Sequence, residues 1–289
     1  MVEFYITNVC NLTCQGCNRF NNYKFSGFQR WSDYHDTYAS WAERLDIMGS
    51  IVVLGGEPML NPDFIPWIQG IRQLWPNPRL VILTNGYRIK QQPELYNFLL
   101  KNKKNTILAV GIHNKISKKF ITEQVEEFLT APISYKFNND NPYWQYADLT
   151  DANGVCVRIK HEWWFHQGPL IRNSETTNFT LHQSDPERAH ATCEYKKCHN
   201  FVNGKLYKCG PVALFPEFAQ QHQFDLSLDD QELMHAYQPL SASDSDQQFE
   251  QFINDLPNAI GQCRFCPEEY HGQQIFSQEK KVLFQKGIN

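Results

Sequence analysis

Residues 9–18 read VCNLTCQGCN and contain three cysteines at the spacing C-x3-C-x2-C, namely Cys10, Cys14 and Cys17. The apolar residues just before them predict a first strand over Val2 to Ile6, which places the cysteines on the loop that follows the strand. Thiolates are soft ligands that suit iron and zinc, so three of them on one loop can hold three corners of a cubane iron–sulfur cluster. The fourth corner would stay open, whereas a structural metal site normally has four protein ligands.

A glycine motif follows the second predicted strand. Residues 50–54 read SIVVL, and the chain continues as Gly55-Gly56-Glu57-Pro58. Two positions without side chains let the backbone approach a ligand closely, and Glu57 supplies an acceptor for an ammonium group. Taken alone, the two glycines are also compatible with a simple tight turn.

The cysteine spacing and the glycine motif together resemble the radical S-adenosylmethionine (radical SAM) enzymes. The resemblance implies that the three cysteines bind a [4Fe–4S] cluster whose open iron chelates the amine and carboxylate of S-adenosylmethionine (SAM). It also implies that an electron from the cluster cleaves SAM to a 5′-deoxyadenosyl radical, and that Gly55, Gly56 and Glu57 hold the methionine end. Gly16 departs from the resembled pattern, because many members carry an aromatic residue there. The alternatives for the three thiols are a zinc site or ordinary buried cysteines.

Two further predicted strands end in polar residues. Leu80 to Leu83 leads into Thr84-Asn85-Gly86, and Thr106 to Ile112 ends at His113. Open parallel sheets and barrels bind ligands at the carboxyl ends of their strands. In radical SAM enzymes a similar Thr-Asn-Gly lies near the SAM ribose and carboxylate, so the resemblance adds Thr84 and Asn85 to the SAM site. His113 would lie on the rim of that site, and a hydrogen-bonded structural histidine is the simpler alternative.

The order of the predicted elements indicates the fold class. From residue 1 to about 183, short β-branched runs alternate with helix-period segments, which predicts βα units and a parallel sheet. Later strands are expected near residues 132–137, 155–160 and 177–183, and they complete six βα-like repeats. The resemblance implies an α/β fold in which residues 1–183 form a partial (β/α)6 TIM-like barrel.

Five more cysteines lie in the last third of the chain, at Cys193, Cys198, Cys209, Cys263 and Cys266. Asn203-Gly204 stands between β-prone residues and predicts a two-residue hairpin turn. Residues whose numbers add to 407 then face each other, so Cys198 and Cys209 would lie opposite, with about 5 Å between their Cβ atoms. Such a pair is half of a metal site, and the later C-x2-C can supply the other half.

This second group is similar to the auxiliary-cluster extension called SPASM or, in its shorter form, Twitch, whose signature includes Gly-x4-Cys and a later C-x2-C. The resemblance implies that residues 184–289 form a small, Twitch-like α+β domain with an auxiliary [4Fe–4S] cluster. Hairpin geometry favours Cys198 as its first ligand, and the longer spacing of the signature favours Cys193. The surplus thiol can be a spare ligand, a hydrogen-atom donor to a substrate radical, or neither. A zinc-ribbon-like site is the alternative for the whole group.

Composition narrows the class of protein. The 289 residues are 42% hydrophobic, enough for a sizeable core, and the net charge of −4 leaves no basic stripe for nucleic acid. No apolar run reaches about 18 residues and no charged-then-apolar leader is present, so no membrane partner is expected. Nine cysteines, an odd count, favour metal binding over disulfides and indicate a reducing compartment, which places the protein in the cytoplasm.

The resemblance implies an enzyme that abstracts a hydrogen atom from a peptide or small-molecule substrate. Modification of a ribosomally made peptide (RiPP-type) or another natural product is the first expectation. A radical SAM dehydrogenase of a small alcohol or aminocyclitol-like metabolite is the alternative, and a non-catalytic metal-binding module is the second alternative. The expected partners are a reducing protein such as flavodoxin or ferredoxin and, because the cluster motif begins at residue 10, a separate leader-peptide-binding protein.

Overall fold

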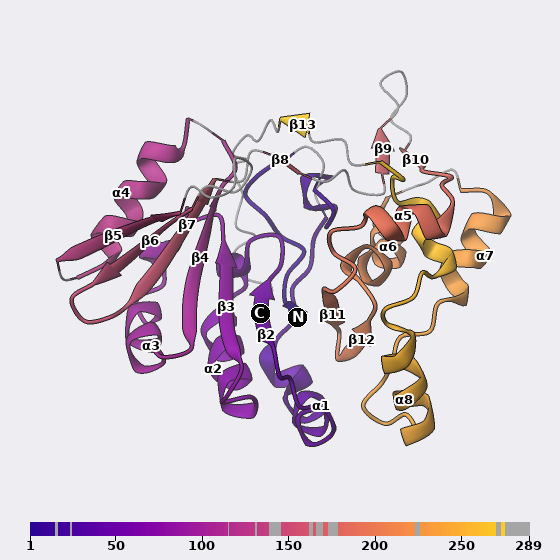
Figure 1. The fold of residues 1–289 in the computed structure, drawn as a ribbon, viewed down its shortest axis with the longest axis horizontal. Helices are drawn as coiled ribbons and strands as arrows, with labels where there is room; N and C mark the ends of the chain where they lie inside the picture. The colour runs from indigo at the N-terminus through magenta and orange to yellow at the C-terminus, as the bar shows by residue number, and fades with distance from the viewer. Residues whose placement is uncertain are drawn as a thin grey trace, which may run out of the picture.

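The computed structural model describes residues 1–14, 17–23, 25–114, 116–130, 132–138, 146–161, 164–165, 170–172, 179–222, 226–269 and 273–274. Its central element is a nine-stranded sheet in the order β12-β11-β1-β2-β3-β4-β7-β6-β5 (Figure 1). The strands of this sheet are β1 (Val2–Tyr5), β2 (Ser50–Leu54), β3 (Arg79–Thr84), β4 (Thr106–Ile112), β5 (Ile133–Asn138), β6 (Tyr146–Asp151), β7 (Cys156–His161), β11 (His199–Val202) and β12 (Lys205–Tyr207). Two smaller sheets pair β9 (Leu170–Arg172) with β10 (Phe179–Leu181) and β8 (Trp164–Phe165) with β13 (Gln273–Gln274).

The helices lie between and after these strands. Those of the described residues are α1 (Trp31–Arg44), α2 (Phe64–Leu74), α3 (Leu95–Lys101), α4 (Lys118–Phe128), α5 (Pro186–Thr192), α6 (Gly210–Gln221), α7 (Leu228–Ala236) and α8 (Asp246–Asp255). Short 3-10 turns are η1 (Asn21–Tyr23), η2 (Pro58–Leu60), η3 (Ile89–Gln91) and η4 (Gly261–Phe265). In Figure 1, α5 to α8 gather beyond the β12 edge of the sheet. No helix among the described residues combines the length and the apolar character that crossing a membrane requires.

Six neighbouring strands of the sheet run parallel: β11, β1, β2, β3, β4 and β7. This confirms the expected α/β fold with a parallel sheet, as in a partial TIM-like barrel. Within the described residues the sheet stays open, with β12 at one edge and β5 at the other. The carboxyl ends of the parallel strands therefore meet along one side, where the cysteine loop follows β1.

The prediction of six consecutive βα repeats is wrong after β4. Residues 132–137 and 155–160 do form strands, but β5, β6 and β7 pair antiparallel with one another. Only residues 152–155 separate β6 from β7, and a parallel connection needs a crossover of about a dozen residues or more. The expected strand at 177–183 is β10, which pairs with β9 outside the main sheet.

The sixth parallel strand comes from the far end of the chain. β11 pairs in parallel with β1, in a register that places Val2 beside His199 and Phe4 beside Phe201. The main sheet thus continues across the boundary expected at residue 183. The division into residues 1–183 and 184–289 stays a prediction.

The two faces of the sheet differ because successive side chains of a strand point to opposite faces. On one face, Val53, Ile82 and Leu108 pack against apolar residues of α1 to α4, among them the buried Trp41 and Trp67. On the other face, side chains near β1 and β11 pack against α6. A cavity lies at the middle of this second face.

Candidate functional site

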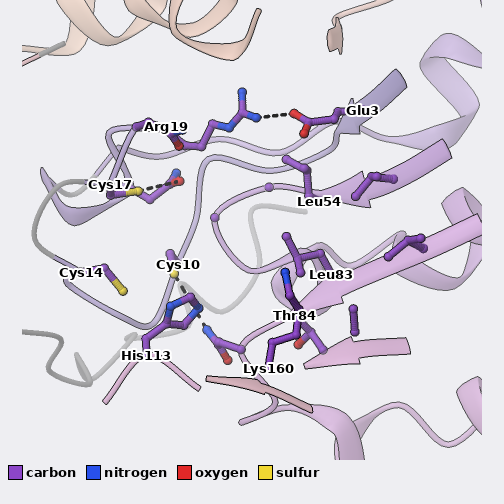
Figure 2. A pocket seen from close by; sticks show the side chains of 18 of the residues that line it. Glu3, Cys10, Cys14, Cys17, Arg19, Leu54, Leu83, Thr84, His113 and Lys160 are labelled. Carbon is purple, nitrogen blue, oxygen red and sulfur yellow. Dashed lines mark hydrogen bonds and ion pairs between the residues drawn. The ribbon is translucent and has the colours of Figure 1, made fainter. Parts of the chain in front are cut away.

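A cavity of about 510 Å³ lies on the inner face of the sheet, at the carboxyl ends of its parallel strands. Inward-facing side chains of β2, β3 and β4 form its apolar wall, namely Val52, Leu54, Val81, Leu83, Ile107 and Ala109. The expected site residues that line the same cavity are Cys10, Cys14, Cys17, Gly55, Gly56, Thr84, Asn85 and His113 (Figure 2). The structure therefore brings together both motifs that carry the resemblance.

The cysteine loop is held by a set of buried amides. The Asn85 Nδ2 donates to Asn11 Oδ1 at 2.7 Å, and the Asn21 Nδ2 donates to the Asn8 carbonyl at 2.6 Å. The Cys10 Sγ accepts from Leu12 N at 3.4 Å. Because Asn85 follows β3, its bond to Asn11 fixes the loop against the end of β3, which lies two strands from β1 in the sheet. Residues 15 and 16, and with them the departure at Gly16 from the resembled pattern, lie outside the described residues.

The two motif glycines have a structural reason that the sequence did not reveal. Gly56 N donates to the Thr7 carbonyl and Glu57 N to the Val9 carbonyl, both at 2.8 Å. A Cβ on Gly55 would lie 2.6 Å from the Thr7 oxygen, and one on Gly56 would lie 2.4 Å from the Val9 oxygen. The glycines thus permit close contact between two backbone segments, and their contact with SAM stays a prediction.

Glu57 ties the end of β2 to the end of β3. Its carboxylate is fully buried and accepts from Thr84 Oγ1 at 2.7 Å, Asn85 N at 2.7 Å and Met59 N at 3.1 Å. Burial raises the pKa of Glu57 to about 7, although these hydrogen bonds act in the opposite direction. Glu57 is not among the residues that line the cavity, so the structure gives it a positioning role and leaves the ammonium contact a prediction.

The hairpin register is confirmed. β11 and β12 pair Asn200 with Tyr207 and Val202 with Lys205, and the turn residues Asn203 and Gly204 have φ angles of 50° and 74°. Both values lie in the left-handed region that a type I′ turn requires.

The hairpin does not extend to the two cysteines. The ladder ends at Asn200 and Tyr207, and Cys209 is the N-cap residue of α6, so neither Cys198 nor Cys209 is paired in the hairpin. A second cavity of about 40 Å³ is lined by Cys193, Cys209, Cys263 and Cys266 but not by Cys198. The arrangement thus favours the longer spacing, with Cys193 as the first ligand.

The two candidate hydrogen-atom donors lie away from the main cavity. Cys193 lines the second cavity, and Cys198 is buried and lines neither one. Neither thiol therefore lines the cavity that holds the three cysteines of the loop. Their donor role stays a prediction that this geometry does not favour.

The donor atoms fit the expected cofactors. Three thiols line the larger cavity and four line the smaller one, and thiolate is the ligand that iron–sulfur clusters use. Burial raises the pKa of Cys209 to about 12 and that of Cys10 well above its ordinary value. In the part of the chain that the structure describes, no group of three or more His, Cys, Asp or Glu side chains converges on a position for one metal ion. The cysteine ligands of a cubane bind different iron atoms.

Two buried or half-buried ion pairs in the cavity wall have no recognisable sequence signal. Arg19 pairs with Glu3 and also donates to Asn200 Oδ1 at 2.9 Å. On the opposite wall, Arg158 pairs with Asp148 through two bonds of 2.7 and 2.8 Å. Burial is the largest single influence and by itself lowers the pKa of Arg19, but the Glu3 carboxylate together with Tyr5, Tyr195 and Cys209 outweighs it and leaves the pKa raised, so the guanidinium stays charged.

Residues 4–114 match the model of the Radical SAM superfamily. The chain therefore carries a radical SAM domain, which belongs to a family of enzymes that use a [4Fe–4S] cluster and SAM. The cysteine loop and the glycine motif both lie within these residues, so the match confirms the radical SAM part of the expected resemblance, and the SPASM or Twitch extension stays a prediction.

Solved structures give a weaker likeness. The chain is similar to SuiB of Streptococcus suis bound to S-adenosylmethionine, with a TM-score of 0.33 and 21% identity over 41% of this chain and 26% of that one. For SuiB bound to its precursor peptide SuiA, the TM-score is 0.34 and the identity 21%, over 41% of this chain and 25% of that one. The match thus spans about a quarter of the length of SuiB. No curated protein sequence matches the chain.

Proposed function

We propose that the protein is a radical SAM enzyme that reductively cleaves SAM and abstracts a hydrogen atom from a peptide or a small molecule. The observation that carries this proposal is the single cavity that collects Cys10, Cys14 and Cys17 together with the glycine motif and the Thr84-Asn85 turn. All of them lie where parallel strands end, which is where α/β proteins bind their ligands.

The residues of the site have different roles in the proposed reaction. When bound, the cluster at the three cysteines and SAM supply one-electron reduction of the sulfonium and a carbon radical. Asn85 orients the cysteine loop through Asn11, and Glu57 holds the ends of β2 and β3 in register. The apolar wall of β2 to β4 keeps water away from the reacting atoms, which limits side reactions.

We further propose that Cys193, Cys209, Cys263 and Cys266 hold an auxiliary [4Fe–4S] cluster in a Twitch-like domain. Four thiols around one small cavity support this ligand set, and Cys198 is the spare thiol. Peptide modification of the RiPP type is the proposed use, with dehydrogenation of a small alcohol as the alternative. Flavodoxin or ferredoxin is the proposed reductant in the cytoplasm.

Anaerobic reconstitution with iron and sulfide tests both clusters. We expect about eight irons per chain and, with a strong reductant, formation of 5′-deoxyadenosine and methionine from SAM. Replacing Cys10, Cys14 and Cys17 together with Ala should halve the iron and abolish the cleavage. Cleavage that persists in this triple variant would refute the radical SAM assignment of the loop.

A further inference from the structure

The Arg19 side chain connects the two cysteine groups. It begins two residues after Cys17, lines the main cavity and ends in an ion pair with the Glu3 carboxylate of β1 (Figure 2). Its Nη1 donates to the Asn200 Oδ1 of β11 at 2.9 Å. Asn200 is itself fixed, because its Nδ2 donates to the Cys198 carbonyl at 2.9 Å. All of these polar side chains are buried, so the guanidinium has one defined position.

That position lies against the start of α6. A Cβ on Gly210 would lie 1.1 Å from the Arg19 Nη1, so the guanidinium occupies the space that any other side chain at this residue would need. Gly210 directly follows Cys209, which lines the second cavity. The guanidinium is therefore packed on the backbone next to a proposed ligand of the second cluster.

A charge in this position acts on the redox state of a neighbouring cluster. Coulomb interactions are strong where water is excluded, and the potential of an iron–sulfur cluster depends on the charge and hydrogen bonds around it. The N-terminus of α6, a helix of 12 residues, adds a partial positive charge at the same place. Positive charge stabilises the reduced cluster, which carries one more electron.

We propose that Arg19 is a positioning residue that fixes the Cys209 side of the second cysteine group and raises the reduction potential of the cluster bound there. The inference rests on the auxiliary cluster proposed above. It links the loop of the first cluster to the potential of the second through one buried side chain, with Glu3 as the opposing charge.

The test isolates the second cluster in the Cys10, Cys14 and Cys17 to Ala background. The midpoint potential is measured by a redox titration followed by electron paramagnetic resonance, with iron content and thermal unfolding recorded for every variant. Arg19→Gln removes the positive charge and should lower the potential. Glu3→Gln removes the negative charge and should raise it.

Two controls separate charge from structure. Arg19→Lys keeps the charge and should leave the potential closer to the parent than Arg19→Gln does. Arg158→Gln removes a paired guanidinium from the opposite wall, away from Cys209, and should leave the potential unchanged. A general disturbance of the fold would instead move all variants in one direction.

The outcomes distinguish a failure of the proposed auxiliary cluster from a failure of the inference about Arg19. A background variant without iron would refute the auxiliary cluster, and the inference would fall with it. A cluster with full iron whose potential is the same in Arg19→Gln and the parent would refute the inference alone. If Arg19→Gln does not retain iron, Glu3→Gln decides, because a lowered or unchanged potential in that variant contradicts the proposed role of the charge.

Discussion

Replacing Gly56 with Ala should destabilise the protein before any cofactor binds. The new Cβ would lie 2.4 Å from the Val9 oxygen, 2.7 Å from the Val9 carbonyl carbon and 2.8 Å from the Cys10 Cβ. Two of these atoms belong to the backbone and cannot rotate away, so the β2 end and the cysteine loop must separate. Overpacking of this kind costs about 3 kcal/mol, at the upper end of its usual range. The Gly56 and Glu57 bonds to the loop would weaken as well.

The assay is thermal or chemical unfolding of the protein without iron. A loss of about 3 kcal/mol corresponds to a decrease in melting temperature of roughly 6–12 °C for a chain of this size class. Gly49→Ala is the matched control, because a Cβ at Gly49 meets no atom within 4 Å. Its unfolding free energy should stay within about 1 kcal/mol of the parent.

The two explanations of the glycine motif give different results in this assay. If the close contact of the two backbones matters, Gly56→Ala loses stability without SAM and also binds iron poorly, since Cys10 is displaced. If the glycine serves only the approach of a ligand, stability is unchanged and SAM affinity alone falls. Gly56→Ala with the melting temperature of Gly49→Ala would refute our reasoning.

The remaining predictions concern Glu57 and the two competing cysteines. The pKa of Glu57 is raised to about 7 from 4.5, so the folded state binds this proton more tightly than the unfolded state, and stability present below pH 4.5 is lost as the pH rises through 7. Between pH 4.5 and pH 7, the unfolding free energy of the parent should therefore fall by about 3 kcal/mol more than that of Glu57→Gln. Parallel pH profiles of the two proteins would contradict the raised pKa of Glu57. Cys193→Ala should lose the iron of the second cluster, while Cys198→Ala should keep it. Iron analysis in the Cys10, Cys14 and Cys17 to Ala background measures this, and the reverse result would make Cys198 the first ligand, as the hairpin geometry predicted.

Local patterns predicted the elements that depend on local chemistry. The segments Ser50–Leu54 and Thr106–Ile112 are β2 and β4 with the expected bounds, because continuous apolar runs between turn residues have few alternatives to a buried strand. The Asn203-Gly204 turn also fixed the register of its hairpin. Both site motifs lie on loops that directly follow buried strands. Because these strands are parallel, the two loops lie together at the carboxyl ends of the strands.

Contacts between distant segments could not be predicted in this way. The Asn61 Nδ2 donates to the carbonyls of Ile6 and Gln29, which lie 55 and 32 residues away in the sequence. The ion pair of Arg19 with Glu3 has the same character, since neither residue has a motif or a periodic neighbour. Which residues pair in this way depends on the tertiary packing of the whole chain, and a local sequence pattern does not contain that information.

The parallel pairing of β11 with β1 has a consequence for how the protein folds during synthesis. β1 receives one of its two neighbours only when residues 199–202 have been made. Until then its edge offers unpaired N–H and C=O groups to any other strand, which is a known route to aggregation. A chain cut after residue 183 would keep this edge permanently, so we expect the first 183 residues to need the rest of the chain for solubility.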